Sequence, residues 1–171
     1  MDIKLTDAER IILANQYEIL SILKKDDSYE VLANNLREGY EWLYSEVFNW
    51  VSPVMDSNDV NLVIDTLSLY ELLRNSYREL SDQTGINPDE LEFPGFDGNG
   101  EAKLRGFAMA LLESERFAHV LGDDVKNSHM PSVDIYARMI DEWKSNGEPT
   151  YPLSKEQIQK ILAARIHPEN R

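Results

Sequence analysis

Apolar residues recur every three or four positions along most of this chain, a spacing that places them on one face of a helix. No segment alternates apolar and polar residues for long enough to predict a strand. The nearest, residues 91–96, is broken by Pro94 and Gly95. Since 171 residues is the usual size of one domain, we predict an all-α fold, a single compact multi-helix domain over residues 1–171 with about six helices.

Two capping boxes mark the predicted first and last helices. Thr6 and Glu9 have the spacing at which a hydroxyl and a carboxylate each satisfy the other's backbone N–H group, which predicts a helix from there to about residue 25. Ser154 and Gln157 repeat this pattern near the carboxyl end. We expect Pro168 to close that last helix, because proline cannot continue one.

Four further helices are predicted, over about residues 28–50, 57–81, 101–121 and 132–147. The segment 57–81 carries apolar residues around most of its circumference, so we expect it to be the central helix. Residues 86–100 form the one long irregular stretch, a loop rich in glycine and proline. Long loops in compact domains are often functional.

The formal charge of −14 opposes direct binding to nucleic acid, because phosphate recognition depends on Lys and Arg. The absence of cysteine excludes disulfides, thiolate nucleophiles and Cys-ligated metal sites. No apolar run approaches the ~20 residues that cross a bilayer, and the chain does not open with a signal sequence. We therefore expect an acidic cytoplasmic protein with no membrane contact.

Residues 97–101, Asp-Gly-Asn-Gly-Glu, resemble the start of a calcium-binding loop. Counted from Asp97, however, Ala102 replaces the turn-forming glycine and Ala108 replaces the bidentate glutamate. We expect Asp97 or Asn99 to cap the following helix instead. The glycines here follow no predicted strand, so a phosphate-binding loop is not predicted either. No cofactor and no metal are expected.

Asn15 is the most suggestive polar residue, because it interrupts the apolar stripe of the first predicted helix. A buried amide must find hydrogen-bond partners. We expect Asn15 to be buried and to bind the loop at residues 94–100, with contact to a ligand as the alternative. Gln16 and Tyr17 adjoin it. The stripe consists of Ala8, Ile11, Ile12, Ile19, Ile22 and Leu23.

Glu115 and His119 are four residues apart, which predicts that they share one helical face. Such a pair can hold a metal or transfer a proton, or it can be an ordinary surface contact. Arg116 lies between them in sequence. The full set of candidate site residues is Asn15, Gln16, Tyr17, Asp97, Glu115, Arg116 and His119.

Several segments together resemble the YfbU family of small bacterial proteins. They are Ala8-Glu9-Arg10-x-Ile12-Leu13-x-Asn15-Gln16-Tyr17, Ile64-Asp65 with Tyr70, Gly95-Phe96-Asp97 with Glu101, and Tyr136-x-Arg138-Met139 with Trp143. The resemblance extends over nearly the whole chain and includes the segment around residues 115–119. It implies an all-helical fold and a bacterial cytoplasmic setting. It implies no activity and no catalytic residue, because the function of the family is uncharacterised.

The first functional hypothesis is a binding or regulatory module that acts as a homo-oligomer and contacts itself or another protein. It rests on an aromatic-rich segment in the second predicted helix, whose members cannot all lie on one face. Packing inside a thick helical core is the alternative explanation for them. These aromatic residues are Tyr40, Trp42, Tyr44, Phe48 and Trp50.

The second hypothesis is a small enzyme with a polar pocket beside the 86–100 loop. No nucleophile–base motif and no cofactor fingerprint supports it, so the sequence leans against an enzyme. A more distant hypothesis is that the acidic surface mimics nucleic acid toward a basic partner. The positions of the candidate residues should separate these three.

Overall fold

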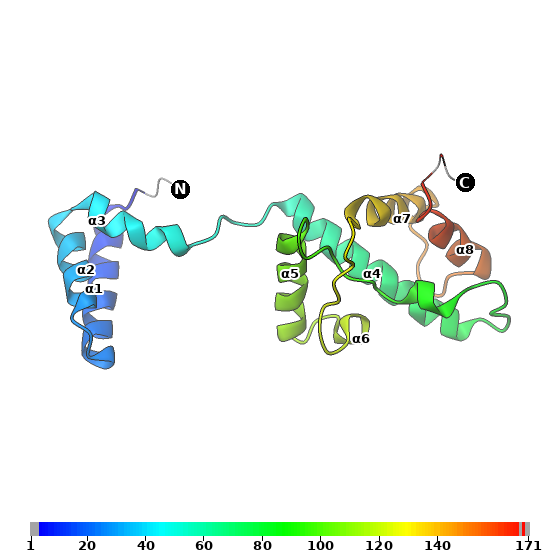
Figure 1. Ribbon diagram of the computed structural model, residues 1–171, viewed down its shortest axis with the longest axis horizontal. Helices are drawn as coiled ribbons and strands as arrows, with labels where there is room; N and C mark the ends of the chain where they lie inside the picture. Colours follow the sequence, from blue (N-terminus) through cyan, green and yellow to red (C-terminus); the bar gives the residue numbers. More distant parts are fainter. Residues whose placement is uncertain (1–3, 168, 170–171) are drawn as a thin grey trace. The chain divides into compact units, whose positions relative to one another are not determined.

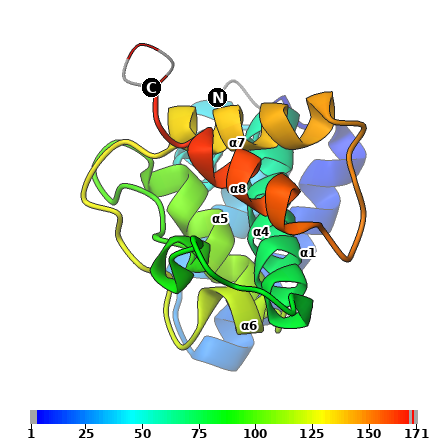
Figure 2. The same cartoon turned by 90° about the vertical axis from the view of Figure 1, so that its right-hand side faces the viewer.

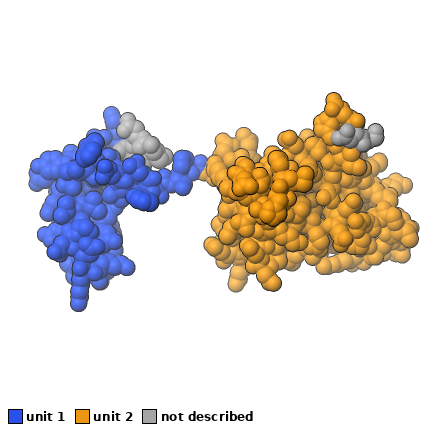
Figure 3. Space-filling model, in the orientation of Figure 1, with its two compact units in different colours: residues 1–54 blue, residues 55–171 orange. Residues whose placement is uncertain are grey.

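The structure is a computed structural model that describes residues 4–167 and 169, and within that part of the chain it is all-α. Eight α-helices and two 3-10 helices are formed there, and the only β interaction is an isolated bridge between Phe96 and Asn127. The predicted fold class is confirmed, with more and shorter helices than the six expected. The chain divides into two compact units, residues 1–54 and 55–171 (Figure 3).

Unit 1 is built on two helices that pack side by side, α1 (Asp7–Lys24) and α2 (Ser28–Glu38) (Figure 1). The capping box at the start of α1 is formed as predicted. The Thr6 hydroxyl accepts from the backbone N–H of Glu9 at 3.3 Å, and the Glu9 carboxylate accepts from that of Thr6 at 2.8 Å. Short helices α3 (Glu41–Ser45) and η1 (Glu46–Trp50) complete the unit.

The prediction of a single helix over residues 28–50 is wrong. Gly39 adopts a left-handed conformation with φ of 75° and ends α2, and its N–H group bonds back to the carbonyl groups of Asn35 and Leu36. Glycine takes this conformation at low cost and commonly ends helices in this way. The chain therefore turns before α3, and the predicted helix becomes three short elements.

The core of unit 1 is small and lies on the opposite side of α1 from the predicted stripe. Its fully buried members are Ala14, Ala33, Leu36 and Tyr44. The large stripe residues, Ile11, Ile12, Ile19, Ile22 and Leu23, are between 50% and 72% exposed. Within unit 1, this stripe does not pack inward as expected. Ala14 and Ala33 have short side chains, and helices approach most closely where the contacting side chains are small.

Unit 2 is organised around α4 (Ser57–Glu79), which contacts the other four α-helices of the unit (Figures 1 and 2). These are α5 (Ala102–Glu113), α6 (Ala118–Leu121), α7 (Val133–Ser145) and α8 (Lys155–Ala163). Buried residues of α4 lie around much of its circumference. The predicted central helix is confirmed, and so is the capping box that begins α8.

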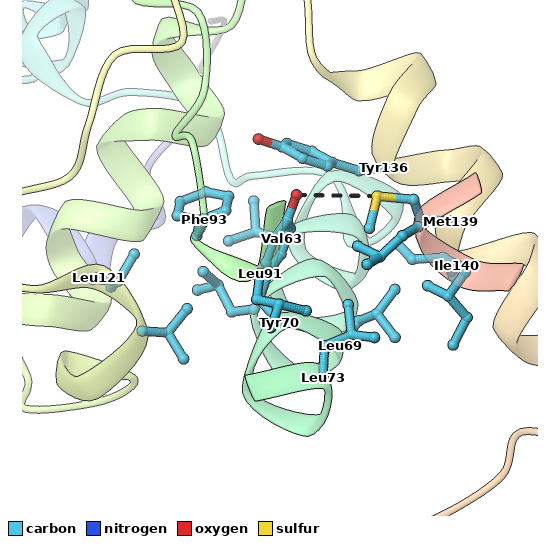
Figure 4. Close-up of a cluster of buried hydrophobic side chains, with 14 of the residues drawn as sticks. Val63, Leu69, Tyr70, Leu73, Leu91, Phe93, Leu121, Tyr136, Met139 and Ile140 are labelled. Atoms are coloured by element: carbon cyan, nitrogen blue, oxygen red, sulfur yellow. Dashed lines mark hydrogen bonds between the residues drawn. The ribbon is translucent and has the colours of Figure 1, made fainter. Parts of the chain in front are cut away.

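The loop between α4 and α5 supplies part of the core of unit 2. It holds the 3-10 helix η2 (Pro88–Leu91) and then buries Phe93 and Phe96. Phe93 packs against Tyr70 and Tyr136, with ring centroids 5.5 and 5.7 Å away (Figure 4). Figure 4 also shows the Tyr70 hydroxyl directed at the sulfur of Met139, 4.0 Å away. The segment is therefore a structural part of the core.

Two further helix boundaries differ from the predictions. The helix expected over residues 101–121 is broken between α5 and α6, where Glu115 and Phe117 have φ of 58° and 56°. The last helix ends at Ala163, five residues before the proline expected to close it, and Pro168 lies outside the described residues. None of the helices in the described ranges is long and apolar enough to span a membrane.

Candidate functional site

The seven candidate residues fall into two groups that lie in different units. Asn15, Gln16 and Tyr17 belong to α1 of unit 1. The other four, Asp97, Glu115, Arg116 and His119, belong to unit 2. Each group is therefore considered within its own unit.

Within unit 1 Asn15 is exposed and not buried. Its expected contact with the 94–100 loop would join the two units and stays a prediction. Its Oδ1 accepts a hydrogen bond from Nη2 of Arg37 in α2 at 3.4 Å, while the same nitrogen bonds Glu18 at 2.6 Å. The error follows from the face of α1 that is buried. Because α1 packs through Ala14, the stripe that contains Asn15 points away from α2.

The neighbours of Asn15 have ordinary environments. Gln16 is exposed. The ring of Tyr17 is half-buried and stacks on Tyr29 of α2 with centroids 6.1 Å apart, and burial raises the pKa of its hydroxyl. Tyr17 therefore helps to hold α1 against α2, and it remains protonated at neutral pH.

Asp97 is buried and stabilises the turn that leads into α5. Its carboxylate accepts from the backbone N–H groups of Asn99 at 3.3 Å and Gly100 at 2.9 Å. The N-cap residue of α5 is Glu101, not Asp97 or Asn99, so the expected cap is displaced. The loop is held from the other side by Asn127, whose Oδ1 accepts from the N–H of Gly98 at 3.0 Å.

Glu101 carries the densest set of hydrogen bonds in unit 2, and the candidate set omitted it. Oε1 accepts from the N–H groups of Ser132 at 2.7 Å and Val133 at 2.9 Å, and Oε2 accepts from the N–H of Asp97 at 2.9 Å and from the Ser132 hydroxyl. Burial alone would raise the pKa of Glu101, but these hydrogen bonds outweigh it and lower the pKa. Glu101 thus joins the loop to the start of α7, where a negative charge is favoured.

Glu115, Arg116 and His119 do not form the predicted cluster. The left-handed residues between α5 and α6 place Glu115 outside any helix, so the i, i+4 relation to His119 is lost. His119 instead pairs with Glu71 of α4, with Nε2 2.8 Å from Oε1. Glu115 and Arg116 are exposed. In the described portion of the chain, no group of three His, Asp or Glu side chains has the arrangement of a metal site.

Two hollows do lie beside the 86–100 loop. The larger, about 590 Å³, is an open groove between the start of the loop and helices α7 and α8, and the smaller, about 90 Å³, is more enclosed and reaches Tyr136. Arg165 lines both, and its Nη1 donates to the carbonyl oxygen of Glu90 at 3.3 Å. None of the seven candidate residues is among the described residues that line either hollow.

Four of the residues that carried the family resemblance in unit 2 converge on one place, Tyr70, Gly95, Phe96 and Tyr136. Tyr136 packs against Phe96 and Tyr70, and its hydroxyl donates to the carbonyl oxygen of Gly95. A methyl group on Gly95 would lie 1.9 Å from the carbonyl oxygen of Lys126, so only glycine fits this backbone. These segments are therefore explained by packing and by the hydrogen bonds that shape the loop.

A family model described as the YfbU domain matches residues 3–164. The chain belongs to the YfbU family. UPF0304 protein MJECS11 of Methanocaldococcus jannaschii is 35% identical over 167 residues, which cover 94% of this chain and 99% of that protein. UPF0304 protein PM1500 of Pasteurella multocida is 30% identical over 165 residues, and a UPF0304 protein of Histophilus somni is 28% identical over 165; each alignment covers 94% of this chain and 99% of the relative. The YfbU match spans both units.

The most distinctive surface of this YfbU protein lies in unit 1. Twelve of the fifteen large hydrophobic side chains that are exposed in the described residues belong to residues 1–54. They include the α1 stripe together with Trp42 at 74% and Trp50 at 91% exposed. Large exposed apolar patches mark sites of protein or membrane interaction, ligand-binding grooves or aggregation-prone surface.

Proposed function

We propose that this protein is a cytoplasmic helical binding or regulatory module that acts as a homo-oligomer, with unit 1 as the element of association. The observation that carries the proposal is the concentration of exposed apolar side chains in unit 1. A soluble monomer rarely leaves so many large hydrophobic residues together in water. Trp42 and Trp50 belong to this surface, and tryptophan is enriched among the residues that dominate binding energy.

The cores of the two units support the same proposal. Unit 1 has four fully buried hydrophobic residues, whereas unit 2 has 23 in one cluster. A chain segment of about 50 residues buries too little surface to be more than marginally stable unless other contacts contribute. Association through the exposed side chains would supply those contacts.

Charge restricts the kind of partner. Residues 1–54 contain 10 acidic and five basic residues, and residues 55–171 contain 21 and 12. Both units are therefore acidic, which opposes direct binding to nucleic acid. We propose that the partners are a further copy of this chain and another protein.

Light scattering coupled to size exclusion tests the association. The monomer mass is 19.7 kDa, and we expect at least twice that mass at micromolar concentration. The double variant Ile12→Ser, Ile19→Ser should lower the mass, because both side chains belong to the exposed stripe. The matched control is Met130→Ser with Tyr151→Ser, two exposed side chains of unit 2, which should leave the mass unchanged. A mass near 20 kDa at every concentration would contradict the proposal.

The alternative function, a small enzyme with a pocket beside the 86–100 loop, is supported by the groove of about 590 Å³ found there. That volume is within the range of small-molecule sites. The test is a thermal-shift screen of small polar metabolites against the wild type and Gln159→Ala, which alters the groove wall. A ligand that stabilises the wild type and loses its effect in this variant would favour the enzyme. No stabilising ligand is expected if the binding module is correct.

A further inference from the structure

Helix α1 is apolar on two opposite faces. One face packs on α2 through Leu13, Ala14 and Tyr17. The other carries the exposed stripe, in which Ala8, Ile12, Asn15, Ile19 and Ile22 follow one another at intervals of four, three, four and three residues. This alternation is the heptad spacing of a helix that pairs with a second helix.

Part of the stripe is arranged symmetrically about Asn15, whereas Ile12 and Leu23 have Glu18 and Asp7 as their counterparts. Ala8 and Ile22 are each seven residues from it, and Ile11 and Ile19 are each four residues from it. If two α1 helices crossed in opposite directions with their Asn15 residues facing, Ala8 of one would lie opposite Ile22 of the other. A small side chain would meet a large one at both ends, which is how facing side chains interdigitate. The stripe is thus complementary to itself.

The charges at the ends of α1 select the antiparallel direction. The first turn carries Asp7 and Glu9, and the last turn and its cap carry Lys24 and Lys25. Arg10, which pairs with Asp7, and Asp26 and Asp27, which follow the two lysines, partly balance these charges. An antiparallel pair brings Asp7 and Glu9 of one helix toward Lys24 and Lys25 of the other, whereas a parallel pair would bring each group against its own copy. The stripe itself holds no charged residue, so two acidic chains can meet there without burying a charge.

Asn15 has the hydrogen-bonding groups that such a pair needs at its centre. Its Oδ1 is oriented by Arg37, which is itself held by Glu18. Among the described residues of unit 1, no acceptor takes a hydrogen bond from Nδ2. A carboxamide carries both a donor and an acceptor, so two of them can bond to each other across a two-fold axis. A polar Asn within an apolar seam is a known device for fixing register and direction.

We propose that α1 pairs antiparallel with α1 of a second copy of this chain, across a two-fold axis that passes beside Asn15. The pairing deepens the proposed function and rests on its homo-oligomer. It covers the exposed stripe of each copy with the same stripe of the other, which is the form of interface that a two-fold dimer requires. The occupant of this surface is a second copy, and the Asn15 pair sets its register.

Disulfide trapping tests the register directly, because the chain contains no cysteine of its own. Ala8→Cys and Ile22→Cys are prepared as separate full-length proteins, mixed and mildly oxidised. A disulfide-linked dimer is expected from the mixture only. In the proposed pair residue 8 of one copy lies opposite residue 22 of the other, whereas two copies of residue 8 are about 21 Å apart at 1.5 Å per residue. Disulfides need Cα atoms within about 7 Å.

Asn15→Cys provides the second trapping position, since the axis beside residue 15 brings it next to its own copy. It should link to itself. The matched control is Asn34→Cys on the exposed side of α2, which should remain unlinked. If Ala8→Cys alone and Ile22→Cys alone each formed a disulfide-linked dimer, the two helices would be parallel. That result would overturn the proposal. A dimer mass in solution without these links would overturn the α1 pairing alone, whereas a monomer mass would overturn the proposed function as well.

A charge placed on the axis supplies a test without cysteine. Asn15→Asp puts two carboxylates face to face in the pair, and we expect the dimer dissociation constant at pH 7 to rise at least about tenfold. Asn34→Asp adds the same charge to unit 1 away from the stripe and should leave the constant unchanged. Equal effects from the two variants would show that net charge, and not the Asn15 contact, controls association and would contradict the pairing.

Discussion

At the scale of single residues, the strongest local constraints lie where the 86–100 loop meets α5 and α7. Glu101 accepts from the backbone of Asp97 on one side and from Ser132 and Val133 on the other. Gly95 lies so close to the backbone at Lys126 that no side chain fits. These contacts join segments about 30 residues apart, and they lead to two predictions.

We expect Glu101→Gln to lower the free energy of unfolding by about 1–3 kcal/mol at pH 7, because an amide cannot accept all the hydrogen bonds that the carboxylate accepts. The pKa of Glu101 is lowered from its ordinary value of 4.5, so the folded state binds its proton less readily than the unfolded state. Its stabilisation is therefore present above pH 4.5 and is lost as the pH falls through the lower, folded pKa. Urea melts at pH 7 and near pH 3.5 measure this.

The difference between wild type and Glu101→Gln should shrink at the lower pH. Glu113→Gln, at an exposed position of α5, is the matched control and should follow the wild type at both values. An undiminished difference near pH 3.5 would mean that the side-chain shape, and not the charge, is responsible.

Alanine substitutions at two glycines should change the stability in opposite directions. Gly95→Ala places a methyl group on a backbone with φ of 96°, 1.9 Å from the carbonyl oxygen of Lys126, and should destabilise unit 2 by more than about 1 kcal/mol. Gly106→Ala lies within α5 where nothing is within 4 Å, and should stabilise by about 0.5–1 kcal/mol. Thermal melts followed by circular dichroism would show shifts of opposite sign. Shifts of the same sign would contradict the structure of the loop.

At the scale of secondary-structure elements, α4 and α1 differ in how they are covered. Both helices carry apolar residues on more than one face. Neighbouring helices of unit 2 surround α4, whereas within unit 1 α1 has α2 on one face and its stripe exposed on the other. A truncated side chain in α4 should therefore destabilise the protein strongly, because it leaves a cavity that water does not fill.

Leu67→Ala in α4 should lower the free energy of unfolding by about 2–5 kcal/mol, the range for a fully buried leucine whose cavity cannot collapse. Leu112→Ala, at a partly exposed position of α5, is the control and should cost less. Denaturant melts of the two variants measure both losses in free energy of unfolding. A loss under about 1 kcal/mol for Leu67→Ala would show that α4 is not the centre of unit 2.

At the scale of the whole molecule, the chain consists of two units with very unequal cores, joined through residues 51–56, which have no regular helix. The large cluster of buried residues belongs entirely to residues 55–171. We therefore expect most of the intrinsic stability to lie in unit 2.

Cleavage between the units tests this expectation. A protease site inserted at residues 51–56 should release a fragment that begins near Met55, remains helical and still unfolds cooperatively, because its buried cluster is intact. The fragment that ends near Val54 should depend on protein concentration for its helicity, because its few buried residues are insufficient alone. Circular dichroism of the separated fragments is the measurement. A carboxyl-terminal fragment without cooperative unfolding would contradict the assignment of stability to unit 2.

Local sequence patterns were enough to predict the all-α class and the start of several helices. The Thr6–Glu9 and Ser154–Gln157 boxes are formed as predicted because their hydrogen bonds join residues three apart. The central position of α4 was also predictable, because apolar residues around most of a helix require cover on most sides. The candidate site was predicted less well: Asn15 is exposed, and Glu101, whose partners lie 31 and 32 residues away, was missed.

Local patterns did not predict which face of α1 is buried within unit 1, or where two long predicted helices break. Periodicity shows that a face is apolar, but it does not show what covers that face, and in α1 two opposite faces were available. Gly39, Glu115 and Phe117 end or interrupt helices by adopting left-handed backbone conformations. Two of the three are not glycine, so residue type alone does not predict these breaks. Such choices depend on contacts between segments distant in sequence, which no local pattern contains.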